Sequence, residues 1–249
     1  MKEISWKDNL RIAWLGSFLT GACISLVVPF MPIFVEQLGV EPSQVTFYSG
    51  LAISVSAISA ACVSPLWGIL ADRYGRKPMM IRAGLAMTIT MGGLAFVPNV
   101  YWLLALRLLN GVFTGFVPNA TALIASQVPK DKSGYALGTL SSGVVAGTLT
   151  GPFVGGMIAE VFGIRNVFLM VGGFLFLAAI LTIFFIKENF QPVPKEKALP
   201  TKELFTSVKY PFLLINLFLT SFVIQFAAQS IGPILALYVR DLGQKENLL

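Results

Sequence analysis

The ten residues GILADRYGRK, at positions 68–77, stand between two apolar segments and decide the fold of this chain. The apolar segment before them runs from 42 to 71, and the one after them runs from 83 to 97 and gains a further turn from 78 to 82. A helix needs about 20 apolar residues to cross a hydrocarbon core ~30 Å thick. The stretch 68–77 is therefore expected to be a short basic loop between two membrane-spanning helices.

Composition extends this pattern to the whole chain. Of its 249 residues, 55% are hydrophobic and 12% are charged, whereas a soluble domain has about 25% charged residues. Seven apolar segments are candidates to cross a bilayer, at residues 12–35, 42–71, 83–97, 101–128, 133–159, 166–186 and 210–239. The sequence therefore predicts an all-α polytopic membrane protein, whose fourth segment is interrupted only by Arg107.

Several classes of function are excluded by the composition. The chain has no histidine, and Cys23 and Cys62 each stand alone in an apolar segment, so neither a metal site nor a disulfide framework is expected. The net charge is +6, but the cations form short clusters and no stripe that could follow a phosphate backbone. No nucleophile and base stand in a recognisable arrangement. We therefore expect no enzyme activity, cofactor or nucleic-acid partner.

The distribution of lysine and arginine predicts the orientation in the membrane, because cytoplasmic loops carry an excess of these residues. Clusters precede the first apolar segment and follow the second, fourth and sixth, at Lys2, Lys7, Arg11, Arg73, Arg76, Lys77, Arg82, Lys130, Lys132, Lys187, Lys195, Lys197, Lys202 and Lys209. We expect a multi-pass protein of the cell membrane with a cytoplasmic N-terminus.

The spacing of the segments predicts two domains of unequal length. Residues 1–186 hold six segments joined by short loops, 187–209 form a polar stretch with three prolines, and 210–249 hold one further segment. Carriers made of two six-helix halves have this layout. The sequence predicts a six-helix half, a cytoplasmic linker and the start of an incomplete second half. We expect the chain to be truncated, either as a fragment or as a disrupted gene product.

The loop 68–77 has a chemistry of its own. Gly68 is expected to let another backbone approach, and Gly75 to allow a tight turn. Asp72 offers a carboxylate to nearby cations or to a helix N-terminus. The cations of the loop are Arg73, Arg76 and Lys77. They could also do no more than fix the orientation of the helices.

Arg107 stands inside the apolar segment 101–128. An ionisable residue at membrane depth is a functional candidate, although an arginine near the outer interface could extend to the headgroups instead. At helical spacing, Arg107 shares a face with Asn110, Thr114 and Thr121. This face is expected to line a central cavity.

The apolar segment 133–159 carries a ladder of small residues. Four glycines recur every four residues, and a Gly-Pro and a Gly-Gly pair overlap them, at Gly143, Gly147, Gly151, Pro152, Gly155 and Gly156. Small residues at this spacing form a flat groove for close helix contact, and proline permits bending. Packing of this kind is common in membrane bundles, so a purely structural role is the alternative.

The first and seventh segments carry candidate substrate contacts. Pro29 and Pro32 free backbone carbonyls in the first segment, which a cavity or a neighbouring helix must satisfy; a simple kink would explain them equally well. In the seventh segment, Phe222, Gln225 and Gln229 share a face that suits amphipathic organic compounds. The two glutamines could instead bond to another helix.

These motifs resemble those of a known family. The loop 68–77 resembles the signature loop of the major facilitator superfamily. Arg107, Gly111 and Gly115 resemble a motif in the fourth helix of that family. Residues 147–156 resemble the antiporter motif of its drug:proton exporters, and the resemblance covers essentially the whole chain.

The resemblance implies alternating-access export of hydrophobic drugs, such as dyes and fluoroquinolones, in exchange for protons. It also implies that the loop 68–77 latches two halves together, which favours the outward-facing state, and that Arg107 takes part in proton coupling. The implied partners are the lipid bilayer, amphipathic drugs, protons and a missing C-terminal half. A facilitator or importer of a small nutrient and a remnant that does not transport are the alternatives.

An antiporter needs a group that titrates, yet every acid stands in a loop or near a segment end. Glu36 follows the first segment and Asp72 follows the second, so both are candidates for proton coupling. Glu36 could simply mark the membrane interface, and Asp72 could serve the loop alone.

Overall fold

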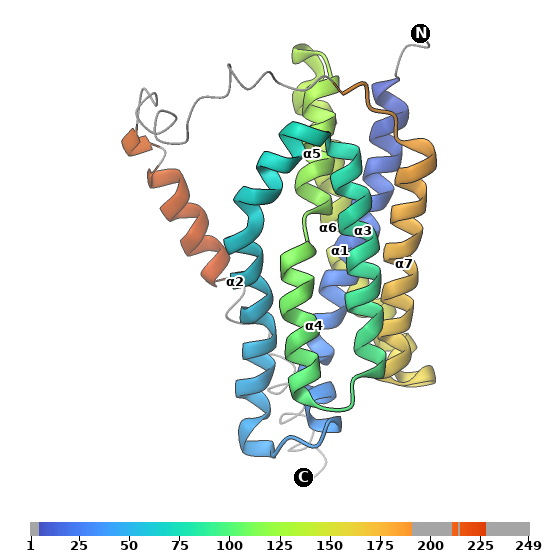
Figure 1. Cartoon of the computed structure of the whole chain (residues 1–249), viewed down its shortest axis with the longest axis vertical. Helices are drawn as coiled ribbons and strands as arrows, with labels where there is room; N and C mark the ends of the chain where they lie inside the picture. Colours follow the sequence, from blue (N-terminus) through green and yellow to red (C-terminus); the bar gives the residue numbers. More distant parts are fainter. Residues whose placement is uncertain (1–4, 191–210, 214, 228–249) are drawn as a thin grey trace, which may run out of the picture. The chain divides into compact units, whose positions relative to one another are not determined.

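The computed structural model describes residues 5–190, 211–213 and 215–227. The chain divides into two compact units, Met1–Gln191 and Pro192–Leu249. In the described part of the first unit, six helical stretches are long and apolar enough to cross a membrane, and no β-strand occurs (Figure 1). This confirms the predicted all-α polytopic architecture.

The helices follow one another in chain order, with two short 3-10 turns between them. They are α1 Trp6–Gln37, α2 Pro42–Tyr74, α3 Arg76–Gly93, η1 Leu94–Phe96, α4 Val100–Phe113, α5 Phe116–Gln127, η2 Lys130–Lys132, α6 Ser133–Phe162 and α7 Ile164–Phe185. Together α4 and α5 make one crossing, Val100–Gln127. The first six predicted segments are therefore confirmed in number and order.

Local sequence explains where two of these helices begin. The side chain of Ser5 accepts a hydrogen bond from the backbone N–H of Asp8 (3.4 Å) at the start of α1. Asn99 accepts from the N–H groups of Tyr101 and Trp102 (3.1 and 3.2 Å) at the start of α4. Such caps satisfy N–H groups that the first turn of a helix leaves open.

α1 is the central helix and contacts α2, α5, α6 and α7. Its most extensive contact is with α6, while α3 packs mainly on α7 and α2 mainly on α4. One part of the apolar core surrounds Phe34 and Phe168, whose ring centroids are 4.7 Å apart, and another surrounds Met80 and Phe116. The start of α1, the turn between α2 and α3 and the end of α7 lie at one end of the bundle, which we call the N-terminal end (Figure 1).

The fourth crossing differs from the prediction. One continuous helix over 101–128 was expected, with Arg107 as the only charge in its apolar run. Arg107 does lie inside a helix, α4, but the helix breaks at Thr114 and Gly115. Thr114 is extended (φ −60°, ψ 168°) and Gly115 has φ +131°. Because a positive φ of this size favours glycine, Gly115 allows the chain to leave the helix and re-enter it at once.

The seventh predicted segment belongs to the second unit. Its described part is an apolar helix, Pro211–Ala227. The remainder of the predicted segment 210–239 lies outside the described residues. The division into 1–186, 187–209 and 210–249 stays a prediction.

Candidate functional site

The predicted signature loop is the tight turn between α2 and α3. α2 ends at Tyr74, Gly75 turns the chain with φ +100°, and α3 begins at Arg76. A Cβ atom on Gly75 would stand 2.8 Å from Oε2 of Glu188 and 3.2 Å from the ring of Phe190. Glycine is therefore required here by the backbone conformation and by the space available.

Gly68 lies on an open side of α2. No heavy atom of another described element lies within 4 Å of the place where its Cβ would be. In the described part of the chain this side of α2 faces an open pocket, so the approach of a second backbone at Gly68 stays a prediction.

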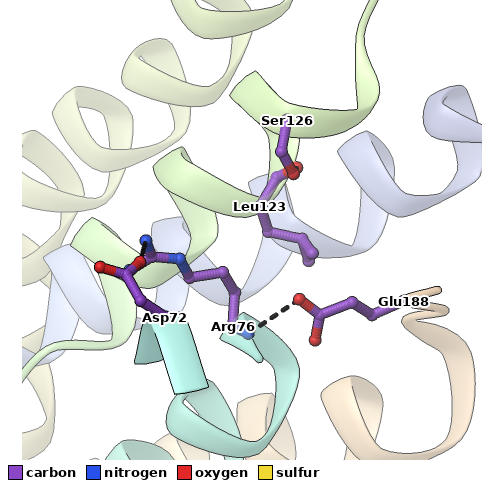
Figure 2. A network of polar contacts seen from close by, with 5 residues as sticks. All are labelled: Asp72, Arg76, Leu123, Ser126 and Glu188. Atoms are coloured by element: carbon purple, nitrogen blue, oxygen red, sulfur yellow. Dashed lines mark hydrogen bonds and ion pairs between the residues drawn. The ribbon is translucent and has the colours of Figure 1, made fainter. Parts of the chain in front are cut away.

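Asp72 and Arg76 form an ion pair across the turn (Figure 2). The side chain of Asp72 is 62% exposed and that of Arg76 is 27% exposed. An ion pair with this exposure adds little to folding stability. The guanidinium of the neighbouring Arg73 lies over the ring of Tyr74, 5.4 Å from its centroid. The exposed ion pair between Asp72 and Arg76 can therefore break and form with other partners at a small change in free energy.

Glu188 is a member of this site that the sequence analysis missed. Its Oε1 accepts a hydrogen bond from the backbone N–H of Arg76 (2.8 Å) and its Oε2 accepts one from the N–H of Lys77 (2.7 Å). Figure 2 shows the carboxylate of Glu188 pointing at the start of α3 from beyond the end of α7. A carboxylate is stabilised at a helix N-terminus by the open N–H groups and the helix dipole. No local signal in the sequence joins residues so far apart along the chain.

The segment that follows α7 is also bonded to α1 and α5. The backbone N–H of Lys187 donates to Oδ1 of Asn9 (2.9 Å), and its carbonyl accepts from Asn9 Nδ2 (2.6 Å) and Gln127 Nε2 (3.0 Å). Lys77 reaches the last turn of α7, where its ammonium donates to the carbonyl of Ile183 (2.8 Å). In the same region Figure 2 draws Ser126 and Leu123 of α5. Residues 187 and 188 thus tie α1, α3, α5 and α7 together at the N-terminal end.

Arg107 is buried in α4, with 6% of the residue exposed. Its Nε and Nη2 atoms have no hydrogen-bond partner among the described residues. This burial does not fit a side chain that extends to lipid headgroups. The facing helix α2 bonds to the backbone at this level instead, since Ser56 Oγ donates to the carbonyl of Arg107 (2.7 Å) and Ser59 Oγ to that of Leu108 (3.1 Å).

The predicted polar face of the fourth crossing is divided by the helix break. Asn110 is 7% exposed and accepts a hydrogen bond from Thr90 Oγ1 of α3 (3.0 Å), so it lies in a helix interface and not on an open cavity. Thr121 lies on α5, is exposed, and donates to the carbonyl of Val117 in its own helix (2.9 Å). These two residues therefore do not share one cavity face in the described part of the chain, because Asn110 packs against α3 and Thr121 lies beyond the break, on α5.

Two side chains complete the helix break, and the sequence analysis did not identify either role. Trp67 Nε1 donates to the carbonyl of Val112 (2.6 Å). Arg82 Nη2 donates to the carbonyls of Phe113 (3.3 Å) and Thr114 (3.1 Å), and its guanidinium carbon lies 3.4 Å from the centroid of the Trp67 ring. In a membrane, carbonyls freed from a helix need such partners. Arg82 therefore has a structural task beyond its place in a basic loop.

A pocket of about 390 Å³ opens beside the break, between α2 and the α4–α5 crossing. Its wall combines the ring of Trp67 with polar groups of Ser64, Thr114 and Asn119, and Arg76 reaches its edge. Of the residues predicted to line a cavity in the fourth crossing, Thr114 is therefore the one that lines this pocket.

The glycine ladder of α6 faces α1. A Cβ atom on Gly143 would stand 2.9 Å from the carbonyl oxygen of Trp14, and one on Gly155 would stand 2.6 Å from Cγ of Leu26. Gly147 and Gly151 meet the α1 backbone at least as closely. Gly156 has no such neighbour within 4 Å, and Pro152 is exposed within a continuous helix. Close packing against α1 therefore accounts for the four spaced glycines.

The other candidates lie apart from these clusters. Pro29 and Pro32 are inside the continuous helix α1, and Glu36 is exposed in its last turn. In the second unit, Phe222 and Gln225 are exposed on the apolar helix, and the Phe222 ring stacks on that of Phe226 (centroids 6.0 Å apart). Gln229 lies outside the described residues.

Comparison with known proteins identifies the family of this chain. The model of the Major Facilitator Superfamily matches residues 13–248. Over 249 residues the chain is 86% identical to the multi-drug resistance efflux pump PmrA of Streptococcus pneumoniae serotype 4, covering 100% of this chain and 62% of that protein. It is 53% identical to the PmrA homolog of Lactococcus lactis (100% and 61% covered) and 50% identical to the multidrug resistance protein MdtG of Klebsiella pneumoniae (98% and 60%).

The chain thus spans about 60% of the length of these curated relatives. A crystal structure of the human organic anion transporter MFSD10 (TETRAN) has the same fold, with a TM-score of 0.65 at 19% identity over 83% of this chain and 54% of that one. Because the family model matches nearly the whole sequence and the helices adopt the corresponding fold, the chain belongs to the major facilitator superfamily.

Proposed function

We propose that this chain forms the first six-helix half, and part of the second, of a carrier that exports amphipathic drugs in exchange for protons. The observation that carries the proposal is the buried guanidinium of Arg107, with two nitrogens that lack a partner among the described residues. A charge at membrane depth is expensive and marks a transport path by default. The names of the relatives, multidrug efflux pumps and resistance proteins, support the substrate class.

Arg107 serves proton coupling in this proposal, although a guanidinium itself keeps its proton. Its open N–H groups attract an acid, and a carboxylate that enters this site gives up its proton more readily while it is paired. Glu36 and Asp72 are the acids of the first unit that we propose as partners in this cycle. An acid from the remaining part of a longer carrier is the other source.

The turn between α2 and α3 serves as the latch of the carrier. Asp72 is exposed and paired only with the neighbouring Arg76 among the described ion pairs, so it can turn to a cation or a helix N-terminus of a second half. Glu188 holds the turn in place from the linker side. We propose that the latch closes the carrier toward the cytoplasm, with the N-terminal end of the bundle and the linker 187–209 on that side.

We propose substrate contacts in each unit separately. The first unit contributes the pocket beside the helix break, with Thr114 in its wall. The second unit contributes Phe222, Gln225 and Gln229. Asn110 acts indirectly, by fixing α4 to α3. In this proposal the chain acts as a carrier and not as an enzyme.

Dye efflux from energised bacteria tests the proposal. Because the relatives are longer, the chain is joined to the part of the streptococcal PmrA that follows its matched region, and ethidium export is followed by fluorescence. We expect export that a protonophore abolishes. Arg107→Lys should keep little of it, since an ammonium cannot reproduce the planar fork of the guanidinium, whereas Lys130→Gln, at an exposed position of η2, should keep most.

Three results would contradict parts of the proposal. One is ethidium export that continues unchanged with the protonophore, which would remove proton coupling. Another is accumulation of a single polar nutrient together with indifference to dyes, which would assign the chain to uptake. Export by the 249-residue chain alone would contradict the need for a second half.

A further inference from the structure

A groove of about 420 Å³ lies between the first turns of α1 and α6, away from the clusters described above. We call it the α1–α6 groove. Its lining combines aromatic rings, two cations, a hydroxyl and an apolar side chain, from Trp6, Lys7, Leu10, Arg11, Trp14, Tyr135 and Thr139. This composition differs from the close contact of the α6 glycines with α1 that joins the two helices further along their length.

The two cations of the groove are available to an anion. Lys7 lies over the ring of Trp6, 5.8 Å from its centroid, and has no ion pair among the described residues. Arg11 is paired with Asp8 at 3.4 Å, but both side chains are mostly exposed. Such a pair contributes little free energy and is readily exchanged. An anion placed between Lys7 and Arg11 would therefore form two charged contacts, and only the weak ion pair between Arg11 and Asp8 would be broken.

The walls of the groove are preformed. Trp14 Nε1 donates to Ser142 Oγ of α6 (3.2 Å), and its ring stacks on Phe18 with centroids 5.7 Å apart. Leu10 is buried at the base. Trp14 therefore keeps its orientation whether or not the groove is filled.

The position of the groove places it at the membrane interface. The apolar segment of α1 begins at residue 12, directly after Arg11, and tryptophan and tyrosine are enriched at the level of the lipid headgroups. Tyr135 is 71% exposed. Leu149, 14 residues further along α6 and on the same helical face, is also exposed. A ligand that contacts both the cations of the groove and the apolar face of α6 near Leu149 has an anionic head and a long apolar tail.

We propose that the α1–α6 groove binds one anionic phospholipid, with its phosphate between Lys7 and Arg11 and an acyl chain along the Tyr135 face of α6. Basic pockets between membrane helices bind the heads of anionic lipids in this way. A zwitterionic lipid gains less, because its own ammonium group is repelled by the two cations. Lipid binding requires neither drug export nor a particular orientation of the bundle in the membrane. If the N-terminal end of the bundle is cytoplasmic, as proposed, the bound lipid belongs to the cytoplasmic leaflet.

Native mass spectrometry of the detergent-purified 249-residue chain tests this site. Phosphatidylglycerol and phosphatidylcholine with identical acyl chains are titrated separately, and glycerol 3-phosphate serves as the headgroup without a tail. We expect one tightly held phosphatidylglycerol, weaker phosphatidylcholine and no retained glycerol 3-phosphate. The double variant Lys7→Gln/Arg11→Gln should weaken phosphatidylglycerol about thirtyfold, since each cation near an anionic surface contributes about fivefold.

Matched variants keep this test decisive. Lys130→Gln/Lys132→Gln removes two exposed cations from η2, outside the groove, and should leave the affinity within about twofold. The exchange Lys7→Arg/Arg11→Lys keeps both charges and should retain binding. Equal loss in the two glutamine variants, equal affinity for both lipids, or retention of glycerol 3-phosphate would each overturn the proposal. So would loss of the lipid when the chain is joined to a second half, because that half would then occupy the groove.

Discussion

At the scale of single residues, the charged side chains of the first unit differ in how they are partnered. Arg107 and Arg82 each have two buried nitrogens without a hydrogen-bond partner among the described residues. Arg82 differs because its Nη2 donates to two carbonyls and its guanidinium lies over a ring, while Asp72 forms an exposed ion pair. A buried charge without a counter-ion destabilises a fold. Arg107 should therefore be the residue at which stability and function oppose each other.

Replacing Arg107 by methionine should stabilise the bundle and abolish export. Methionine fills a similar volume and removes the desolvated charge, so the free energy of unfolding should rise by about 2 kcal/mol. Thermal unfolding of the purified chain measures the gain, and ethidium export by the joined protein measures the loss. Arg82→Met is the contrasting variant and should destabilise, because carbonyls at the helix break lose their donor. A lower melting temperature for Arg107→Met would mean that this guanidinium has a native partner.

Replacing Glu188 by glutamine should weaken the attachment of the linker to α3. Glutamine keeps one acceptor for the N–H groups of Arg76 and Lys77 but loses the charge at the helix N-terminus, which contributes about 0.5–1 kcal/mol. We expect a lower melting temperature and slower export by the joined protein. Glu160→Gln is the control, since that carboxylate is exposed in the last turn of α6. Equal behaviour of the two variants would remove Glu188 from the site.

At the scale of elements, α1 and α6 form a close and extensive helix pair. The four spaced glycines of α6 bring its backbone against that of α1, and this contact is the most extensive between any two described helices. Dispersion between closely packed backbones drives helix association in lipid. The pair should therefore move as one body during transport.

The ladder can be tested by adding one methyl group at a time. Gly147→Ala should destabilise the bundle by about 1–3 kcal/mol, because the new Cβ would overlap the carbonyl of Phe18 and overpacking forces the helices apart. Gly156→Ala should be neutral, since its Cβ would meet no other described element within 4 Å. Thermal unfolding of the two purified variants makes the comparison. A neutral Gly147→Ala would show that the helices are further apart in the membrane.

Elements marked by local patterns were predicted from the sequence, and those made by distant contacts were not. Apolar segments, the Pro-Asn turn before α4 and the turn at Gly75 depend on neighbouring residues, so the sequence shows them directly. The cap by Glu188 and the bond from Thr90 to Asn110 join separate helices. The break at Gly115 was missed because a glycine four residues after Gly111 is equally consistent with close helix packing and with a helix break. The hydrogen bonds from Trp67 and Arg82 to the carbonyls at the break distinguish these two roles.

At the scale of the whole molecule, the N-terminal end of the bundle gathers the basic turns. The clusters before α1, between α2 and α3, and at η2 all belong to it, while the α4 start at Asn99 belongs to the opposite end (Figure 1). The chain crosses the membrane an even number of times between one basic cluster and the next, so all of them lie on the same side. The positive-inside bias therefore acts on all of them in the same direction.

Cysteine labelling in intact bacteria should show the basic end inside. In a background with Cys23→Ala and Cys62→Ala, a cysteine is placed at Lys130 or at Pro98, both exposed and at opposite ends of the α4–α5 crossing. A maleimide that cannot cross membranes should label only the Pro98→Cys variant in intact cells, and the Lys130→Cys variant as well once the cells are permeabilised. The reason is that the basic clusters resist transfer across the membrane, while the turn before α4 carries no charge. Labelling of Lys130→Cys from outside would invert the bundle and place the latch and the linker on the external face.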